Sequence, residues 1–136
     1  MRALFDANVL VSALLSRTET PARLVTLWLD AAFELIVCPA LLGEVERALA
    51  HPKLRPRSEP ADAERFVKLL SELGEMVPDA DRPPPVRSAD PGDDYLLALA
   101  AREQVPLISG DNHLLALRDR APVSSSREFL GRLADR

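Results

Sequence analysis

Four short apolar segments alternate along this chain with longer segments of helical spacing. The apolar segments are Arg2–Asp6, Glu34–Cys38, Glu75–Val77 and Pro106–Ser109. Their length and character are those of strands buried on both faces. Strands separated by helices form a parallel sheet covered on both sides. We therefore predict an α/β fold with a mostly parallel sheet, in which Val123 begins a short fifth strand.

Apolar stripes and breaking residues mark the helices. We expect helices at Val9–Leu15, Thr20–Ala31, Ala40–Ala50, Pro60–Leu73, Asp93–Glu103, Asn112–Arg118 and Arg127–Ala134. Thr20 and Pro21 suit the N-cap and first position of the second helix. The fourth helix has an apolar side that includes Phe66 and Leu73, with Leu69 and Leu70 between them.

The segment Pro78–Gly92 contains five prolines and no helical or strand pattern. We interpret it as an ordered or semi-rigid connection, because too little chain follows it to build a second core. A length of 136 residues also suits one domain, so we expect a single domain over residues 1–136.

Bulk composition sets the expected surroundings of the protein. No apolar stretch is long enough to span a bilayer, and no membrane association is expected. The single cysteine, Cys38, cannot form an internal disulfide, which fits a reducing cytoplasm. The net charge of −4 does not favour a nucleic-acid partner, although four acids at a metal site would account for it. All cationic side chains except Lys53 and Lys68 are arginines, which can hold phosphate with two hydrogen bonds.

Acids follow the expected strands at one edge of the sheet. Asp6 ends the first strand, Asp111 follows the fourth, and Asp93 and Asp94 begin a helix. In parallel α/β folds, strand ends and the helix starts that follow them share one edge, where active sites lie. These acids are therefore expected to lie near one another.

Each acid alone has a structural explanation. Asp6 suits an Asx turn, Asp111 a helix N-cap, and Asp93 and Asp94 the positive end of a helix dipole. Together they pose an electrostatic problem, because two carboxylates 5 Å apart repel by roughly 3 kcal/mol at an effective dielectric of 20. A hard divalent cation, Mg²⁺ or Mn²⁺, would relieve it, and oxygen ligands favour these ions over zinc.

A further acid is expected from the helix at Ala40–Ala50. Glu44 and Glu46 flank its apolar stripe about equally, because successive residues of a helix are about 100° apart. Helical spacing alone leaves open which of the two reaches the site.

Four segments in order resemble the PIN-domain nucleases, and in particular the branch described as toxin components of toxin–antitoxin systems. They are FDANVLVSA at Phe5–Ala13, PALLGEVERAL at Pro39–Leu49 with HPKL at His51–Leu54, DPGDDYLLALA at Asp90–Ala100 and LISGDNHLL at Leu107–Leu115. Each is weakly specific alone, but the four in register, with their spacers, cover most of the chain.

The resemblance assigns roles to individual residues. It implies that the metal-binding and catalytic acids are Asp6, Glu44, Asp94 and Asp111, and it selects Glu44 over Glu46. Asp93 is an auxiliary acid beside Asp94. Asn8 and Ser109 are implied to orient the acids.

The resemblance also implies a fold and an activity. The fold is a three-layer α/β/α sandwich around a five-stranded parallel sheet. The activity is endonucleolytic hydrolysis of single-stranded RNA with one or two Mg²⁺ or Mn²⁺ ions. A homodimer and a cognate antitoxin protein are the implied partners. By their positions, Arg17, Arg23, Arg118 and Arg120 are candidate phosphate contacts.

Other functions are weighed against this one. A Mg²⁺-dependent phosphatase of the haloacid-dehalogenase type would need an aspartate where Asn8 stands and a lysine near the site. A receiver domain would need a lysine after a late strand, which is absent. A non-catalytic scaffold that binds RNA or protein is the remaining alternative, and the presence of every motif acid argues against it.

Overall fold

Five parallel strands form a sheet through the centre of the molecule in the computed structural model, which describes residues 1–136. The spatial order is β3-β2-β1-β4-β5, and every neighbouring pair is parallel. The strands are β1 Arg2–Phe5, β2 Glu34–Val37, β3 Glu75–Met76, β4 Leu107–Ile108 and β5 Val123–Ser124. This confirms the predicted parallel sheet, including its fifth strand.

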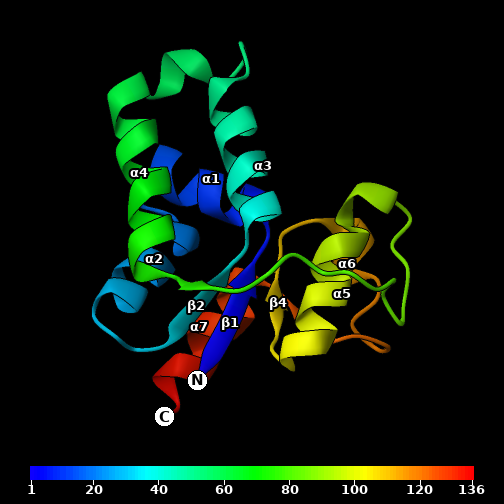
Figure 1. The fold of residues 1–136 in the computed structure, drawn as a ribbon. Helices are drawn as coiled ribbons and strands as arrows, with labels where there is room; N and C mark the ends of the chain where they lie inside the picture. The colour runs from blue at the N-terminus through cyan, green and yellow to red at the C-terminus, as the bar shows by residue number, and fades with distance from the viewer.

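Seven α-helices complete a three-layer sandwich. They are α1 Ala7–Leu15, α2 Thr20–Leu29, α3 Pro39–Ala50, α4 Pro60–Leu73, α5 Asp94–Glu103, α6 Asn112–Leu115 and α7 Ser126–Ala134, with 3₁₀ turns η1 at Arg55–Arg57 and η2 at Pro91–Asp93. Figure 1 shows α5 and α6 on the opposite side of β1 and β4 from α1, α2, α3 and α4. Helix α7 packs against α2 and so belongs with the group formed by α1, α2, α3 and α4. None of these helices is both long enough and apolar enough to cross a bilayer.

Strand order explains this division of helices. The chain runs from β1 to β2 to β3 in one direction, then returns past β1 to β4 and β5. Right-handed crossovers place helices on one face during the outward run and on the other face after the reversal. The reversal makes the gap between β1 and β4 the topological switch point, where parallel α/β folds form their sites.

Some predicted details differ from the structure. The N-cap of α2 is Glu19 and not Thr20, which is the first residue of the helix, and α2 ends at Leu29, two residues before the expected end. Helix α6 has four residues, because turns replace the helix over its expected second half. The buried side of α4 includes Ala63 and Val67, while Leu73, in its last turn, is 58% exposed and lines a hollow with Trp28 and Phe33.

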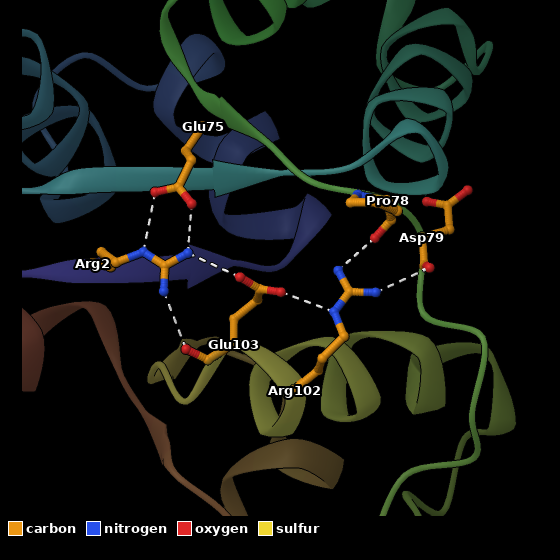
Figure 2. A network of polar contacts seen from close by, with 6 residues as sticks. All are labelled: Arg2, Glu75, Pro78, Asp79, Arg102 and Glu103. Carbon is orange, nitrogen blue, oxygen red and sulfur yellow. Dashed lines mark hydrogen bonds and ion pairs between the residues drawn. The ribbon is translucent and has the colours of Figure 1, made fainter.

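An ionic network ties the sheet to α5 at the edge opposite the strand ends (Figure 2). Arg2 of β1 donates to both carboxylate oxygens of Glu75, at 3.0 and 2.5 Å, and to the carboxylate of Glu103 at 2.9 Å. Arg2 hydrogen bonds lower the pKa of Glu75, and Arg2 followed by Arg102 lowers the pKa of Glu103. One guanidinium therefore joins β1, β3 and the end of α5.

The segment between β3 and η2 is held at both ends. Arg102 donates to the carbonyl oxygens of Pro78 and Asp79, at 2.6 and 3.2 Å, as Figure 2 shows. The Asp79 carboxylate accepts from the backbone N–H of Ala40 at 2.9 Å, near the start of α3. At the far end, the backbone N–H of Ser88 donates to Asp94 at 2.9 Å.

Replacing Arg2 should destabilise the fold. Arg2→Ala leaves Glu75 and Glu103 facing each other without a cation, and we expect a loss of about 1–2 kcal/mol in the free energy of unfolding at pH 7. Because the folded-state pKa values of both glutamates are lowered, the loss should be full above pH about 4.5 and should shrink as pH falls through those lowered values. Urea denaturation at several pH values measures it.

Arg65→Ala is the matched control. Arg65 pairs with Asp62 on α4, but its side chain is 71% exposed. Exposed pairs of this kind contribute about 0.5 kcal/mol or less. Equal effects of the two substitutions would contradict a structural role for the Arg2 network.

Candidate active site

Asp6 lies at the carboxyl end of β1 and is almost completely buried, with 4% exposure. Its backbone N–H donates to the carbonyl of Ile108 at 3.0 Å, which continues the β1–β4 register by one residue and sets Asp6 beside Ser109. The Ser109 hydroxyl donates to Asp6 Oδ2, and the backbone N–H of Val9 donates to Oδ1 at 2.8 Å. Asp6 is thus both the N-cap of α1 and a fixed carboxylate at the switch point.

Asp111 lies two residues beyond Ser109. The Ser109 hydroxyl accepts from the backbone N–H of Asp111 at 2.9 Å, so one serine connects both aspartates. Asp111 Oδ1 accepts from the backbone N–H of His113 at 2.8 Å and caps α6. Ser109 thus contacts Asp6 and Asp111, and its role in orienting them for metal binding stays a prediction.

Glu44 approaches these acids from the middle of α3. The Tyr95 hydroxyl of α5 donates to Glu44 Oε1 at 3.1 Å. The negative charge of Glu44 also contributes to raising the pKa of Asp6 and of Asp93. Glu46 is exposed and lines a separate hollow with Leu49, between α3 and α4. The structure therefore places Glu44, and not Glu46, with the aspartates.

Asp93 and Asp94 have different surroundings. Asp94 Oδ1 accepts from the backbone N–H of Ser88, and its Oδ2 lies 3.3 Å from Arg87 Nη1. Asp93 makes no side-chain capping bond to α5, and its Oδ2 is buried without a hydrogen-bond partner. The structure thus groups Asp93 with the other acids, whereas the carboxylate of Asp94 holds the preceding loop.

Burial and mutual repulsion shape the charge of the cluster formed by Asp6, Glu44, Asp93 and Asp111. Burial raises the pKa of Asp93 to about 6, with further increases from Asp111, Asp90, Asp6 and Glu44. Burial also raises the pKa of Asp6, against the hydrogen bonds from Ser109 and Val9. No arginine or lysine forms an ion pair with any of the four; the nearest ionic partner is His113, 3.8 Å from Asp111.

The donor set fits a hard divalent cation. The cluster offers carboxylate oxygens alone, which suit Mg²⁺ or Mn²⁺. The orphaned Oδ2 of Asp93 is a buried acceptor of the kind that a cation would satisfy. The carboxyls do not form a ready-made coordination sphere, because no three His, Cys, Asp or Glu side chains are placed to hold one ion together. Mutual repulsion favours such separation, and a cation would have to draw these side chains inward.

Asn8 makes no direct contact with the Asp6 carboxylate through its side chain, so its orienting role stays a prediction. It lies in the first turn of α1, is exposed, and makes no side-chain hydrogen bond to Asp6. It instead lines a hollow of about 310 Å³ beside Asp111, together with Ser12 and Ser126.

The four candidate phosphate contacts are spread over the surface. Arg17, Arg23, Arg118 and Arg120 are all exposed. Arg118 pairs with Glu128 at 3.1 Å, and no ion pair connects any of the four to the acid cluster. The structure therefore does not gather them around the cluster, and their contact with RNA stays a prediction.

Tyr95 and Arg87 contact site acids in ways that the sequence did not indicate. Nothing in the local pattern distinguishes Tyr95 from a packing residue, because its partner Glu44 is 51 positions away. Arg87 lies in the proline-rich segment, where side-chain direction cannot be inferred from periodicity.

The family model of the PIN domain matches residues 2–113. Among solved structures, the crystal structure of VapBC2 from Rickettsia felis, bound to a DNA fragment from their promoter, is similar to this chain with a TM-score of 0.61. The likeness covers 92% of this chain and 98% of the other, at 11% sequence identity, and it concerns the fold. No curated protein matches the sequence significantly.

Removing one charge from the cluster should stabilise the protein in EDTA. The pKa of Asp93 in the folded protein is near 6, above its ordinary value of 3.8. The free energy of unfolding therefore falls as pH rises from about 4 to about 6, because the folded state gives up this proton less readily than the unfolded state. We expect Asp93→Asn to add about 1–2 kcal/mol to the free energy of unfolding at pH 8, a figure reduced from the full shift because the side chain is partly exposed.

The gain from Asp93→Asn should fade below pH about 4, where Asp93 is protonated in both states. Denaturant unfolding at pH 4 and pH 8 checks both points. A mutant less stable than wild type at pH 8 would show that Asp93 is not electrostatically strained.

Proposed function

Because this chain belongs to the PIN-domain family of nucleases, we propose that it is a Mg²⁺- or Mn²⁺-dependent ribonuclease that cuts single-stranded RNA internally. One observation carries the proposal. Asp6, Glu44, Asp93 and Asp111, from four separate segments, act on one another electrostatically, and none of them forms an ion pair with an arginine or a lysine. Such a cluster is electrostatically unfavourable alone and suits one or two divalent ions together with a phosphate group.

The residues of the cluster would divide the work of binding and orientation. Asp6, fixed by Ser109 and the backbone of Val9, would be the most rigid ligand. Asp111 would be held by the start of α6. When bound, a divalent ion would supply charge to polarise the scissile phosphate and to acidify the attacking water.

We assign the fourth ligand position to Asp93 and not to Asp94. The expectation for Asp94 came from the family resemblance, in which Asp93 was an auxiliary acid at the same position. Asp93 supports the new assignment through its orphaned oxygen and its electrostatic coupling to Asp111, Asp6 and Glu44. Asp94 would act on the site indirectly, by holding Ser88 and Arg87.

We further propose that residues 1–136 act as one domain, as the toxin component of a toxin–antitoxin pair, and as a homodimer. The structural likeness to a chain of a VapBC2 crystal structure supports this cellular role. The partner would be an antitoxin protein that covers the acid cluster, and an arginine from it could neutralise the carboxyls.

If the chain is a nuclease of this kind, we expect substitutions of the adjacent Asp93 and Asp94 to lower the cleavage rate by different amounts. Asp93→Asn should lower the rate of cleavage of a labelled single-stranded RNA by about 100-fold or more, because a charge-stabilising group is lost. Asp94→Asn should reduce the rate by only a few-fold, since its carboxylate contacts the loop. Rates with Mg²⁺, with Mn²⁺ and with EDTA measure the effect.

Two further variants complete the assay. Asp6→Asn should lose activity, and Glu46→Gln, a substitution of an exposed acid outside the cluster, is the control. Wild-type activity that survives EDTA would contradict metal dependence. A greater loss in Asp94→Asn than in Asp93→Asn would return the ligand role to Asp94. Mn²⁺ binding without cleavage of any RNA would indicate a non-catalytic scaffold.

The toxin role is tested in cells. Induced expression of the wild-type chain should arrest bacterial growth, whereas Asp6→Asn expressed to the same level should not, because cleavage needs the intact cluster. Growth counts and RNA integrity measure the difference. Equal arrest by both proteins would contradict toxicity through RNA cleavage.

A further inference from the structure

Glu44 has a problem of positioning that Asp6 and Asp111 do not share. Asp6 and Asp111 stand at helix starts, where free backbone N–H groups of Val9 and His113 hold their carboxylates. Glu44 lies inside α3, where the helix uses its own N–H groups, so no backbone donor is free nearby. Its side chain is also longer and loses more rotamer freedom on ordering.

Tyr95 supplies the missing donor. Its hydroxyl donates to Glu44 Oε1 at 3.1 Å across the gap between α5 and α3. No second hydrogen bond engages Oε2. Tyr95 is half-buried in the first turn of α5, two residues after Asp93. This contact therefore connects the helix of one acid to the carboxylate of another.

The hydrogen bond between Tyr95 and Glu44 also acts against electrostatic repulsion. The charges of Asp6 and Asp93 repel that of Glu44. Asp6 cannot move away, because hydrogen bonds from Ser109 and from the backbone of Val9 hold its carboxylate. Glu44 is half-buried on a helix that faces solvent, so repulsion alone would turn its carboxylate outward. A hydrogen bond to one oxygen opposes that movement and leaves the other oxygen available.

We propose that Tyr95 is a positioning residue that holds Glu44 inward as a ligand for the divalent ion. This inference rests on the proposed function, and it assigns to this tyrosine a role in metal affinity. Tyr95 keeps the carboxylate in place before the ion binds, so the ordering of a long side chain is already complete. Outer hydrogen bonds of this kind change metal affinity by about 10- to 100-fold when removed.

Mn²⁺ binding tests this inference without reference to cleavage. The wild type, Tyr95→Phe, Glu44→Gln and the double variant are titrated with MnCl₂ alone, and free Mn²⁺ is measured by electron paramagnetic resonance. Tyr95→Phe keeps the ring and removes only the hydroxyl. Its Kd for Mn²⁺ should rise about tenfold. Glu46→Gln, the same change on an exposed acid of α3, should bind as the wild type does.

The double variant separates positioning from general loosening of the fold. If Tyr95 acts through Glu44, removing the hydroxyl from Glu44→Gln should cause little further loss, so the two effects are not additive. Thermal unfolding in EDTA is measured for each protein, and a merely structural role would lower the melting temperature without this non-additivity.

Two results would overturn the inference while leaving the nuclease proposal intact. One is wild-type Mn²⁺ affinity in a folded Tyr95→Phe protein, and the other is fully additive losses in the double variant. A wild-type protein that binds no Mn²⁺ would overturn the proposed function itself, and the role of Tyr95 with it.

Discussion

Repulsion among four carboxyls at one edge of a parallel sheet is the constraint around which the site is organised. Burial raises the pKa of Asp6 and of Asp93, and neighbouring negative charges raise both further. The fold nevertheless holds Asp6, Glu44 and Asp111 in place through the Ser109 hydroxyl, the Tyr95 hydroxyl and backbone N–H groups at helix starts. The surroundings thus provide hydrogen-bond donors but no arginine or lysine, which leaves positive charge to be supplied from outside.

The same residues serve the fold and the site. Asp6 and Asp111 are genuine N-caps of α1 and α6, so their structural explanations are correct and do not compete with metal binding. The pairing of β1 with β4 brings Asp6 and Ser109 together, and the reversal of strand order creates the gap that they face. At the opposite edge, Arg2 neutralises two glutamates internally, which shows by contrast how unusual the uncompensated cluster is.

Local sequence was sufficient for the parallel sheet, because each buried strand and each amphipathic helix has its own pattern. It also placed acids at one edge, since that follows from parallel topology alone. It could not distinguish the surroundings of Asp93 from those of Asp94, because these depend on a turn of η2 and on the loop donors at Ser88 and Arg87. Tyr95 was equally inaccessible, because its role depends on how α5 packs relative to α3. The shifted buried side of α4 has the same origin in packing.

The central claim is that these carboxyls bind a divalent ion, and a crystal grown in MnCl₂ tests it most directly. Diffraction data collected near the manganese absorption edge locate bound Mn²⁺ by its anomalous difference density. We expect a peak at the switch point, with Asp6, Asp93 and Asp111 among its ligands and Glu44 drawn toward it. A site without such density at saturating Mn²⁺, or a peak bound by Asp94 with Asp93 turned away, would contradict it.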